Sequence, residues 1–314
     1  MNEEKILRRI RKILGPHEKS VVVGIGDDAA VVKWTKKYYL LISCDALVEG
    51  THFLPGEISW EQAGRKALAV NLSDIAAMAG WPLYATVSLG LPRTKTGVIT
   101  SVYRGLRKLA RDFPVSIIGG NLCSSDRFFI DITVIGRVEK NRLVLRSGGS
   151  PGDRIFVTGY LGGSRYGHHF SFEPRVKLAR KLTRLVPVTA MMDISDGLAA
   201  DLPRLASASR TGFLLYLNNL PASPELSRHN ITGNSAITRI LNEGEDYELL
   251  FTVPEKKAFL VPGSIDGVPI TCIGELTPPG RMILSSGEKF PFTTGGFDHF
   301  SSSRKAKSIT GAAS

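Results

Sequence analysis

Acidic residues recur at the ends of apolar runs in this chain, and their placement suggests cation binding. Residues 21–32 hold two adjacent carboxylates, Asp27 and Asp28, between two glycines and two valine-rich runs. At about 4 Å apart, two such charges repel by about 4 kcal/mol at an effective dielectric of 20, so a partly buried pair needs a cation. A polar turn between two strands explains the same residues equally well. The rest of the sequence is needed to distinguish the two interpretations.

Two further carboxylates repeat the pattern in the first half of the chain. An apolar run of strand length at residues 38–45 ends in Asp45. Asn71 and Asp74 are three residues apart in a predicted helix and therefore share one face. That face is either the exposed side of a surface helix or is directed at Asp28 and Asp45.

The second half contains two more acidic segments. Asp193, Ser195 and Asp196 flank a predicted helix start, where Ser195 or Asp196 can act as the cap, although a cap needs only one such residue. Residues 242–248 place four acids directly before an apolar strand, which in so basic a chain is more than a solvated turn requires. Carboxylates on separate loops, with hydroxyls beside them, suit hard cations such as Mg²⁺, and Mg²⁺ commonly accompanies phosphates.

The helices and strands that must position these acids are predicted to form an α/β unit followed by a second domain. Ser59 and Gln62 form a capping-box pattern before a helix that runs to residue 79. A basic helix follows at about 98–112, then strands at 114–121, 128–136 and 143–146. The turn-rich residues 147–152 mark the best domain boundary.

Past this boundary the sequence predicts a strand at 154–158, a glycine loop at 159–164 and a helix at about 174–185. The glycine loop is weak evidence for phosphate binding because it lacks the lysine of a P-loop. His168 and His169 have no ligand partner at metal spacing and are expected at the surface. We expect domains at 1–146 and 153–300, with a disordered tail at 301–314.

Composition limits the possible functions. The chain has 314 residues, of which 43% are hydrophobic and 22% charged, which is enough for two domains with sizeable cores. Three distant cysteines argue against a disulfide framework or a thiolate zinc site. The sequence lacks an apolar run of membrane length and a secretory pattern, so a cytoplasmic location is expected. Serine-hydrolase and zincin motifs are also missing.

The net charge of +11 could indicate nucleic acid, anionic lipid or small polyanionic substrates. Basic and apolar residues alternate at helical spacing over residues 5–14, which predicts an amphipathic helix. Packing on the domain edge is favoured over a membrane surface because the helix is short. No nucleic-acid signature accompanies the charge, so neither nucleic acid nor membrane is expected as a partner.

Taken together, these segments resemble the thiamine-monophosphate kinase family, within the superfamily of aminoimidazole ribonucleotide synthetases. The resemblance spans nearly the whole chain and rests on motifs in family order: residues 24–29, 43–45, 48–53, 67–79, 192–198, 244–249 and 298–300. It implies a two-domain fold of the aminoimidazole ribonucleotide synthetase type, with an N-terminal mixed sheet with helices, a C-terminal α+β sandwich and a homodimer. The implied reaction is the transfer of the γ-phosphoryl group of ATP to thiamine monophosphate, which gives thiamine diphosphate.

The resemblance also implies residue roles. Several Mg²⁺ ions would be held by Asp28, Ser43, Cys44, Asp45, Asp74, Asn121, Asp193 and Asp196. ATP would contact Gly120, Asn121, Arg146 and Ser195, and thiamine monophosphate would contact His52, Glu245 and Phe297. Phe297 is placed to stack on the thiamine ring. No side chain is implied as a nucleophile, so catalysis would consist of positioning and charge neutralisation. Of the first acidic pair, Asp28 is the expected ligand and Asp27 is expected to shape the turn.

Two residues depart from the family pattern. Asn121 stands where many members have Asp, which keeps an oxygen ligand but loses a charge. Cys44 replaces a common Thr and so lacks the hydroxyl. Two alternatives stay open: another ATP-dependent enzyme of the superfamily, and a nucleotide-binding protein without turnover. A selenophosphate synthetase is expected to carry a reactive N-terminal Cys and a hydrogenase maturation factor a C-terminal one, and this sequence has neither.

Overall fold

The computed structural model describes residues 3–54 and 56–297, and the chain divides into two compact units. The N-terminal unit consists of Lys19–Leu143 together with His169–Val176. The C-terminal unit consists of Met1–Glu18, Val144–His168 and Lys177–Ser314. Among the described residues, no helix is both long and apolar enough to cross a membrane.

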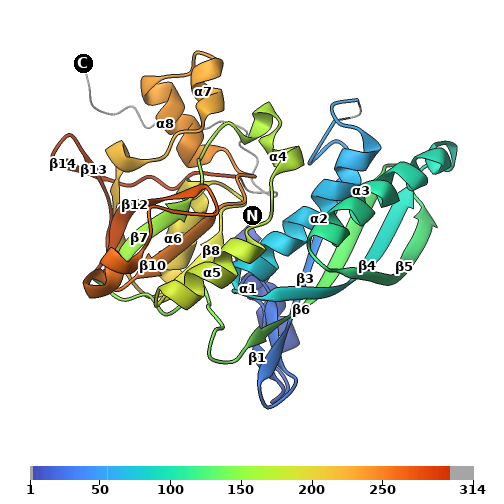
Figure 1. Ribbon diagram of the computed structural model, residues 1–314, viewed down its shortest axis with the longest axis horizontal. Coiled ribbons are helices and arrows are strands. Elements are labelled where there is room, and N and C mark those ends of the chain that lie inside the picture. Colours follow the sequence, from blue (N-terminus) through green and yellow to red (C-terminus); the bar gives the residue numbers. More distant parts are fainter. Residues whose placement is uncertain (1–2, 55, 298–314) are drawn as a thin grey trace. The chain divides into compact units, whose positions relative to one another are not determined.

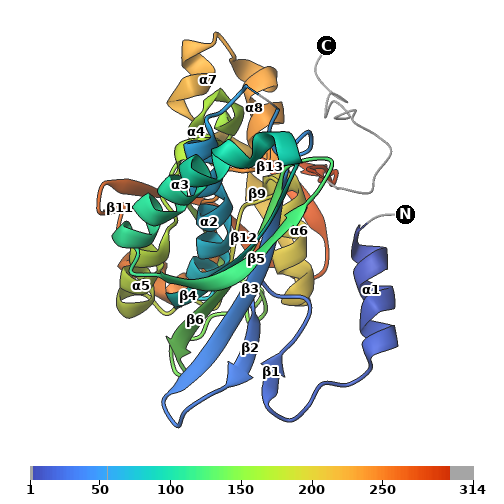
Figure 2. The ribbon, with the colours of Figure 1, turned by 90° about the vertical axis from the view of Figure 1, so that its right-hand side faces the viewer.

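The N-terminal unit is built on one mixed six-stranded sheet. Its strand order is β1-β2-β3-β6-β4-β5, and neighbours are antiparallel except for the parallel pair β4 and β5. Figures 1 and 2 show helices α2 and α3 along one side of this sheet. The elements are β1 (Val21–Val23), β2 (Ala30–Lys33), β3 (Tyr38–Val48), α2 (Trp60–Ala77), β4 (Trp81–Leu91), the 3₁₀ helix η1 (Arg93–Val98), α3 (Ile99–Asp112), β5 (Ser116–Ser124) and β6 (Phe129–Glu139).

Helix α2 begins at the predicted capping box. The backbone N–H of Gln62 donates to Ser59 Oγ at 3.1 Å, and the Ser59 N–H donates to Gln62 Oε1 at 2.9 Å. These two bonds satisfy donors that a helix start otherwise leaves open. The position and orientation of α2 therefore begin with a signal that is local in the sequence.

Helices α2 and α3 cross with their backbones in contact. A Cβ atom on Gly64 would lie 2.1 Å from the carbonyl oxygen of Val102, and one on Gly105 would lie 1.8 Å from that of Glu61. Neither distance leaves room for a side chain, so both helices need glycine here. This close crossing fixes the first half of α2, the helix that carries Asn71 and Asp74.

The C-terminal unit has an eight-stranded sheet in the order β14-β13-β9-β12-β7-β10-β8, with β11 paired to β12. Only β9 and β13 are parallel among these pairs. The core of the unit lies between α6 and the sheet, where Leu202, Phe213 and Leu250 are fully buried. The strands are β7 (Arg154–Thr158), β8 (Ala190–Asp193), β9 (Gly212–Tyr216), β10 (Leu249–Val253), β11 (Ser264–Ile265), β12 (Val268–Thr277), β13 (Arg281–Ser285) and β14 (Glu288–Pro291).

The helices assigned to the C-terminal unit include α1, which confirms the predicted basic helix near the start of the chain. Its apolar residues Ile13 and Leu14 are 82% and 60% exposed, so the expected packing is not seen at that end. The helices are α1 (Glu3–Leu14), η2 (Ser164–Tyr166), α5 (Val176–Leu185), α6 (Leu198–Ala208), η3 (Leu217–Asn219), α7 (Pro224–Arg228), α8 (Gly233–Asn242) and η4 (Glu255–Leu260), with α4 (His168–Ser171) at the boundary of the two units.

A short segment from the second half of the sequence completes the N-terminal unit. Residues 169–176 pack on α2, where Arg65 donates to the carbonyl oxygens of Phe172 at 2.6 Å and Phe170 at 3.4 Å. His169 was expected at the surface, and that expectation is wrong: the residue is buried, with Nδ1 3.0 Å from Lys66 Nζ. Fully buried Lys66 also lies 5.2 Å from the centroid of the Phe170 ring.

The predicted fold class is confirmed by the mixed sheet with helices in one unit and the α+β arrangement in the other. The strand predicted at 143–146 does not form, because these residues run as irregular chain past β8, where Met191 donates to the carbonyl oxygen of Leu145 at 2.9 Å. The motif at 298–300 and the predicted tail lie outside the described residues.

Candidate functional site

The turn between β1 and β2 holds the first candidate ligand. The Asp28 N–H donates to Asp27 Oδ1 at 3.1 Å, as expected of a turn-shaping Asp27. The next residue, Ala29, donates its N–H to Met78 Sδ at the end of α2. Asp28 is therefore buried beside α2, and one of its carboxylate oxygens lies within 4.8 Å of a carboxylate oxygen of Asp74.

Helix α2 directs its polar face at the sheet rather than at solvent, which decides between the two interpretations left open above. Ser43 Oγ on β3 donates to the carboxylate of Asp74. Asn71, fully buried, accepts the backbone N–H of Asp45 at 3.0 Å and donates to the carbonyl oxygen of Ala67. The structure thus brings Asp28, Ser43 and Asp74 together within the N-terminal unit, and Asn71, on the same helix face as Asp74, holds the backbone of Asp45.

Cys44 faces the opposite side of β3, where it is exposed. Its Sγ lies 3.1 Å from Asp131 Oδ1 on β6, with Thr133 Oγ1 at 3.5 Å. Burial of part of the thiol raises its pKa, and Asp131 acts in the same direction. Cys44 therefore stays a neutral thiol at pH 7, a poor ligand for a hard cation. Asp131 was not singled out from the sequence.

Asn121 lies on β5, away from the other N-terminal candidates. In the sheet it pairs with Ser88 on β4, which pairs with Asp131 on β6. Two strands, β6 and β4, thus lie between β3 and β5. The backbones of β3 and β5 are therefore three strand spacings, or roughly 14 Å, apart. Gly120, its neighbour, must be glycine because a Cβ atom would lie 1.9 Å from the carbonyl oxygen of Val87.

His52 sits in the turn after β3, and this turn is held from two sides. Its Nδ1 accepts the backbone N–H of Val48 at 3.0 Å, and Lys66 Nζ lies 3.4 Å from its carbonyl oxygen. At the turn's start, Glu49 accepts hydrogen bonds from Lys95 at 2.7 Å and from the Phe128 N–H at 3.1 Å. The Lys95 bond lowers the pKa of Glu49, outweighing its partial burial.

Asp193 ends strand β8 and is buried, and the loop after it is organised by a residue that sequence reasoning missed. Asp201 Oδ2 accepts the backbone N–H groups of Ser195 at 3.1 Å and Asp196 at 3.0 Å. Neither Ser195 nor Asp196 caps α6, since Gly197 occupies the cap position without a side-chain bond. The only sequence signal for Asp201 was an acid in the first turn of the predicted helix.

Arg204 neutralises this acidic loop. It donates to Asp201 at 2.7 Å and also pairs with the carboxylate of Asp196. Asp201 is fully buried, which raises its pKa to about 7; Asp196 acts in the same direction and Arg204 opposes it. A guanidinium therefore already balances Asp196, one of the predicted metal ligands. Arg146, the predicted ATP contact, is also near enough to Asp201 to lower its pKa.

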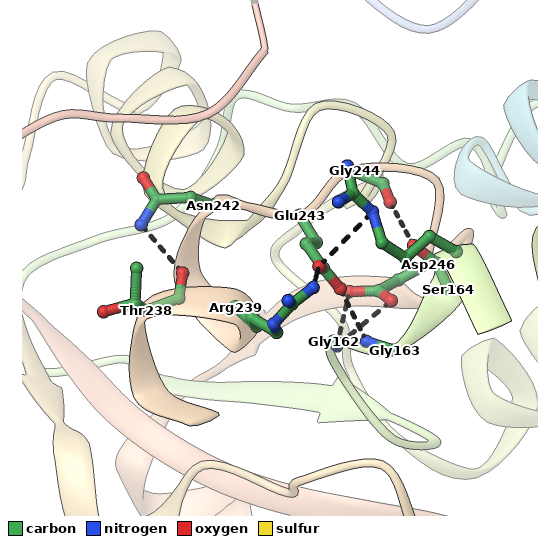
Figure 3. Close-up of polar contacts among 10 residues, drawn as sticks. Gly162, Gly163, Ser164, Thr238, Arg239, Asn242, Glu243, Gly244 and Asp246 are labelled. Carbon is green, nitrogen blue, oxygen red and sulfur yellow. Dashed lines mark hydrogen bonds and ion pairs between the residues drawn. The ribbon is translucent and has the colours of Figure 1, made fainter. Parts of the chain in front are cut away.

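The acidic run before β10 is mostly structural, as Figure 3 shows. Asp246 accepts the N–H of Gly162 with both carboxylate oxygens at 3.1 Å, and Glu243 accepts that of Gly163 at 2.9 Å. Glu248 accepts from Thr158 Oγ1 at 2.6 Å. Burial raises the pKa of Asp246 well above its usual range, although the Gly162 bond opposes this. The glycine loop thus gives two N–H groups to carboxylates of the chain itself.

The remaining acid of that run, Glu245, lies near Phe297, another of the three predicted substrate residues. Its N–H donates to the carbonyl oxygen of Ser195 at 2.7 Å, and the N–H of Phe297 donates to that of Asp196 at 2.9 Å. Phe297 is 48% exposed, so its ring is accessible for stacking. Ser195, Glu245 and Phe297 are therefore gathered around one loop of the C-terminal unit.

Two family models match the chain. AIR synthase related protein, N-terminal domain, matches residues 26–138, and the C-terminal domain matches residues 152–285. Similar proteins include the thiamine-monophosphate kinases of Rhodopirellula baltica, 40% identical over 82% of this chain and 84% of the relative, and of Bacillus subtilis, 34% identical over 90% and 95%. That of Escherichia coli strain K12 is 37% identical over 89% and 92%.

Solved structures agree with the sequence matches. AaThiL complexed with AMPPCP and TMP has a TM-score of 0.83 at 30% identity, covering 95% of this chain and 97% of the other. Thiamine monophosphate kinase from Aquifex aeolicus has a TM-score of 0.75 at 28% identity, covering 93% and 100%. The hydrogenase maturation protein HypE of E. coli, with a TM-score of 0.68 at 20% identity over 81% and 85%, shares the fold.

Proposed function

The chain belongs to the thiamine-monophosphate kinases of the AIR synthase related family, and we propose that it transfers the γ-phosphoryl group of ATP directly to its acceptor with the help of Mg²⁺. The reaction is the ATP-dependent phosphorylation of thiamine monophosphate. Its products are thiamine diphosphate and ADP. The observation that carries the mechanistic part is the close approach of the buried Asp28 carboxylate to the half-buried Asp74 carboxylate.

These carboxylates fit a hard divalent cation. Two carboxylate oxygens within 4.8 Å, one on a buried and one on a half-buried side chain, repel one another unless a positive charge lies between them. The proposed ligands are oxygen donors, with Cys44 offering its backbone oxygen rather than its thiol, and this set suits Mg²⁺ better than a soft metal. They are Asp28, Ser43, Cys44, Asp45, Asp74 and Asn121 in the N-terminal unit and Asp193 and Asp196 in the C-terminal unit. Bound Mg²⁺ would neutralise phosphate charge.

No protein side chain acts as a nucleophile in this proposal. A phosphate oxygen of thiamine monophosphate attacks the γ-phosphorus of ATP, a new P–O bond forms, and the bond to the β-phosphate oxygen breaks with ADP leaving. Gly120, Asn121, Arg146 and Ser195 are proposed to contact ATP, and His52, Glu245 and Phe297 to contact thiamine monophosphate. The protein contributes orientation and charge neutralisation. ATP supply supports a cytoplasmic location.

A homodimer is proposed through the sheet of the N-terminal unit. Tyr84 on β4 is 45% exposed, and Ile118 and Leu122 on β5 are more exposed still. Large apolar side chains gathered on one part of a sheet favour contact with a second surface. Light scattering on the purified protein measures the mass, and a monomeric mass at micromolar concentration would contradict this proposal.

The activity test compares acceptors. Purified protein with ATP and Mg²⁺ is given thiamine monophosphate, unphosphorylated thiamine or no acceptor, and thiamine diphosphate and ADP are quantified by chromatography. We expect both products only with thiamine monophosphate. Release of ADP with another acceptor, but not with thiamine monophosphate, would favour a different enzyme of the superfamily, and nucleotide binding without any turnover would favour a non-catalytic protein.

A further inference from the structure

The residues on both sides of Glu245 are bonded to one glycine loop, residues 162–164. Asp246 takes the N–H of Gly162, Glu243 takes the N–H of Gly163, and Ser164 Oγ donates to the carbonyl oxygen of Gly244 at 2.6 Å. Figure 3 shows these contacts side by side. Three consecutive loop residues thus hold the positions just before and just after Glu245.

The loop can do this only with glycines. Gly162 and Gly163 have φ values of +73° and +82°, which side chains with a Cβ rarely adopt. A Cβ atom on Gly162 would lie 3.0 Å from the backbone nitrogen of Ile240, and one on Gly163 would lie 3.2 Å from Ser223 Oγ. Two successive left-handed residues turn both N–H groups toward the carboxylates.

The backbone of the acidic run is fixed from its other side as well. Glu245 and Tyr247 have positive φ values of 66° and 50°, and their N–H groups donate to the carbonyl oxygens of Ser195 at 2.7 Å and Ile194 at 2.8 Å. A non-glycine residue holds such a conformation only where its surroundings enforce it. The backbone bonds to residues 194–195 and the side-chain bonds to the glycine loop together hold Glu245 and Tyr247 in this conformation.

We propose that Asp246, Glu243 and the glycine loop are positioning residues that aim the Glu245 carboxylate at thiamine monophosphate. This inference rests on the proposed role of Glu245 in binding that substrate. The glycine loop resembles a phosphate loop in composition, but its N–H groups at 162 and 163 serve the chain's own carboxylates. The Ser195 N–H keeps its own hydrogen bond to Asp201 although the Ser195 carbonyl oxygen also accepts from Glu245, so we expect loosening the acidic run to affect thiamine monophosphate more than ATP.

The experiment compares Asp246→Ala with Asp246→Asn in the full-length protein. Alanine removes both acceptors of the Gly162 N–H, whereas asparagine keeps one. We expect Asp246→Ala to raise KM for thiamine monophosphate by about tenfold or more, with KM for ATP within about twofold, and Asp246→Asn to stay within about threefold of the unmodified protein.

Asp153→Ala is the matched control for a purely structural effect. Asp153 is also a buried aspartate of the C-terminal unit, and it accepts from the Ser150 N–H at 3.1 Å and from Thr189 Oγ1 at 2.6 Å. Asp153→Ala should lower the Tm, as we also expect of Asp246→Ala, but without changing the ratio of the KM values for thiamine monophosphate and ATP. If Asp246→Ala yields no folded protein, Ser164→Ala removes the bond to the carbonyl of Gly244 with a smaller change and should shift KM in the same direction.

Glu245→Gln, alone and combined with Asp246→Ala, separates the role of Glu245 in substrate binding from the positioning role of its neighbours. If Glu245→Gln leaves KM for thiamine monophosphate unchanged, the proposed role of Glu245 fails. If Glu245→Gln raises this KM but Asp246→Ala and Ser164→Ala do not, or if both substrates are affected equally, the positioning role is overturned. If positioning acts through Glu245, Asp246→Ala adds nothing further to KM once Glu245→Gln is present.

Discussion

The crossing of α2 and α3 allows a stability prediction whose sign depends on two opposing effects. Gly105→Ala gains helix propensity of about 1 kcal/mol, because glycine is a poor helix former. Against this, the new methyl carbon would lie 1.8 Å from the Glu61 carbonyl oxygen and 2.8 Å from the Arg65 nitrogen. An ordinary contact is about 3.4 Å, so the helices must separate by roughly 1.5 Å.

Such overpacking costs about 1–3 kcal/mol, and more where the clash is with backbone on both sides. Here both contacts are backbone atoms of a helix that cannot rotate away. We therefore expect a net destabilisation of about 2 kcal/mol, which for a unit of this size lowers Tm by about 4–10 °C. Residues 71–74 lie about two to three turns further along α2 and are held by β3, so the folded fraction should remain active.

Thermal unfolding followed by circular dichroism and calorimetry measures the effect. Gly97→Ala is the matched control, because Gly97 lies in the 3₁₀ helix η1 with no atom within 4 Å of its added Cβ. This control should be neutral within about 0.5 kcal/mol. A Gly105→Ala protein as stable as the unmodified one, or more stable, would refute the close helix crossing.

Three further predictions concern the N-terminal unit. Asp28→Asn should lower kcat at least about hundredfold while retaining the fold, and should reduce the rise in Tm on adding Mg²⁺; a near-normal rate would argue against its role as a ligand. Glu49→Gln tests a pH dependence. The pKa of Glu49 is lowered from about 4.5 in the unfolded chain, so its bond to Lys95 stabilises the fold at neutral pH and this contribution is lost as pH falls through the folded pKa. The Tm difference between the unmodified protein and Glu49→Gln should therefore be largest at pH 7 and shrink below pH 4. A difference that stays constant with pH would contradict a stabilising role of the ionised Glu49. Ser59→Ala should cost about 1 kcal/mol by removing the α2 cap, as judged by urea unfolding, and no change would mean that the cap is dispensable.

Features with local causes were predictable from the sequence. The capping box at Ser59 starts α2 as expected. The apolar run expected to end at Asp45 does form a strand, but β3 continues past it to Val48. The roles of Asp28, Asp74 and the other candidate ligands remain predictions, although the structure gathers several of them. The sequence could pair Asn71 with Asp74 on one helix face, but only the packing of α2 on β3 shows that this face is turned toward the sheet.

The features that sequence reasoning missed depend on partners distant in the chain. Glu243 and Asp246 bind glycines that lie 80 and 84 positions earlier in the chain. Nothing in the sequence of either segment indicates that the two are in contact. His169 looked like a surface residue because its partner, Lys66, precedes it by 103 positions. Asp201 resembled an ordinary first-turn acid, since its acceptor role depends on the shape of the preceding loop.

The return of residues 169–176 to the N-terminal unit has a consequence for the order of synthesis. A growing chain that has reached Leu143 contains every strand of the first sheet, yet Arg65 and Lys66 still lack the carbonyl and imidazole groups that meet them in the finished protein. The first unit therefore reaches its final packing only after part of the second has been made. A gene divided between the two sheets would encode an N-terminal fragment in which Lys66 on α2 lacks residues 169–176 as its cover. The two units have separate sheets, but the first cannot complete its packing without a segment encoded with the second.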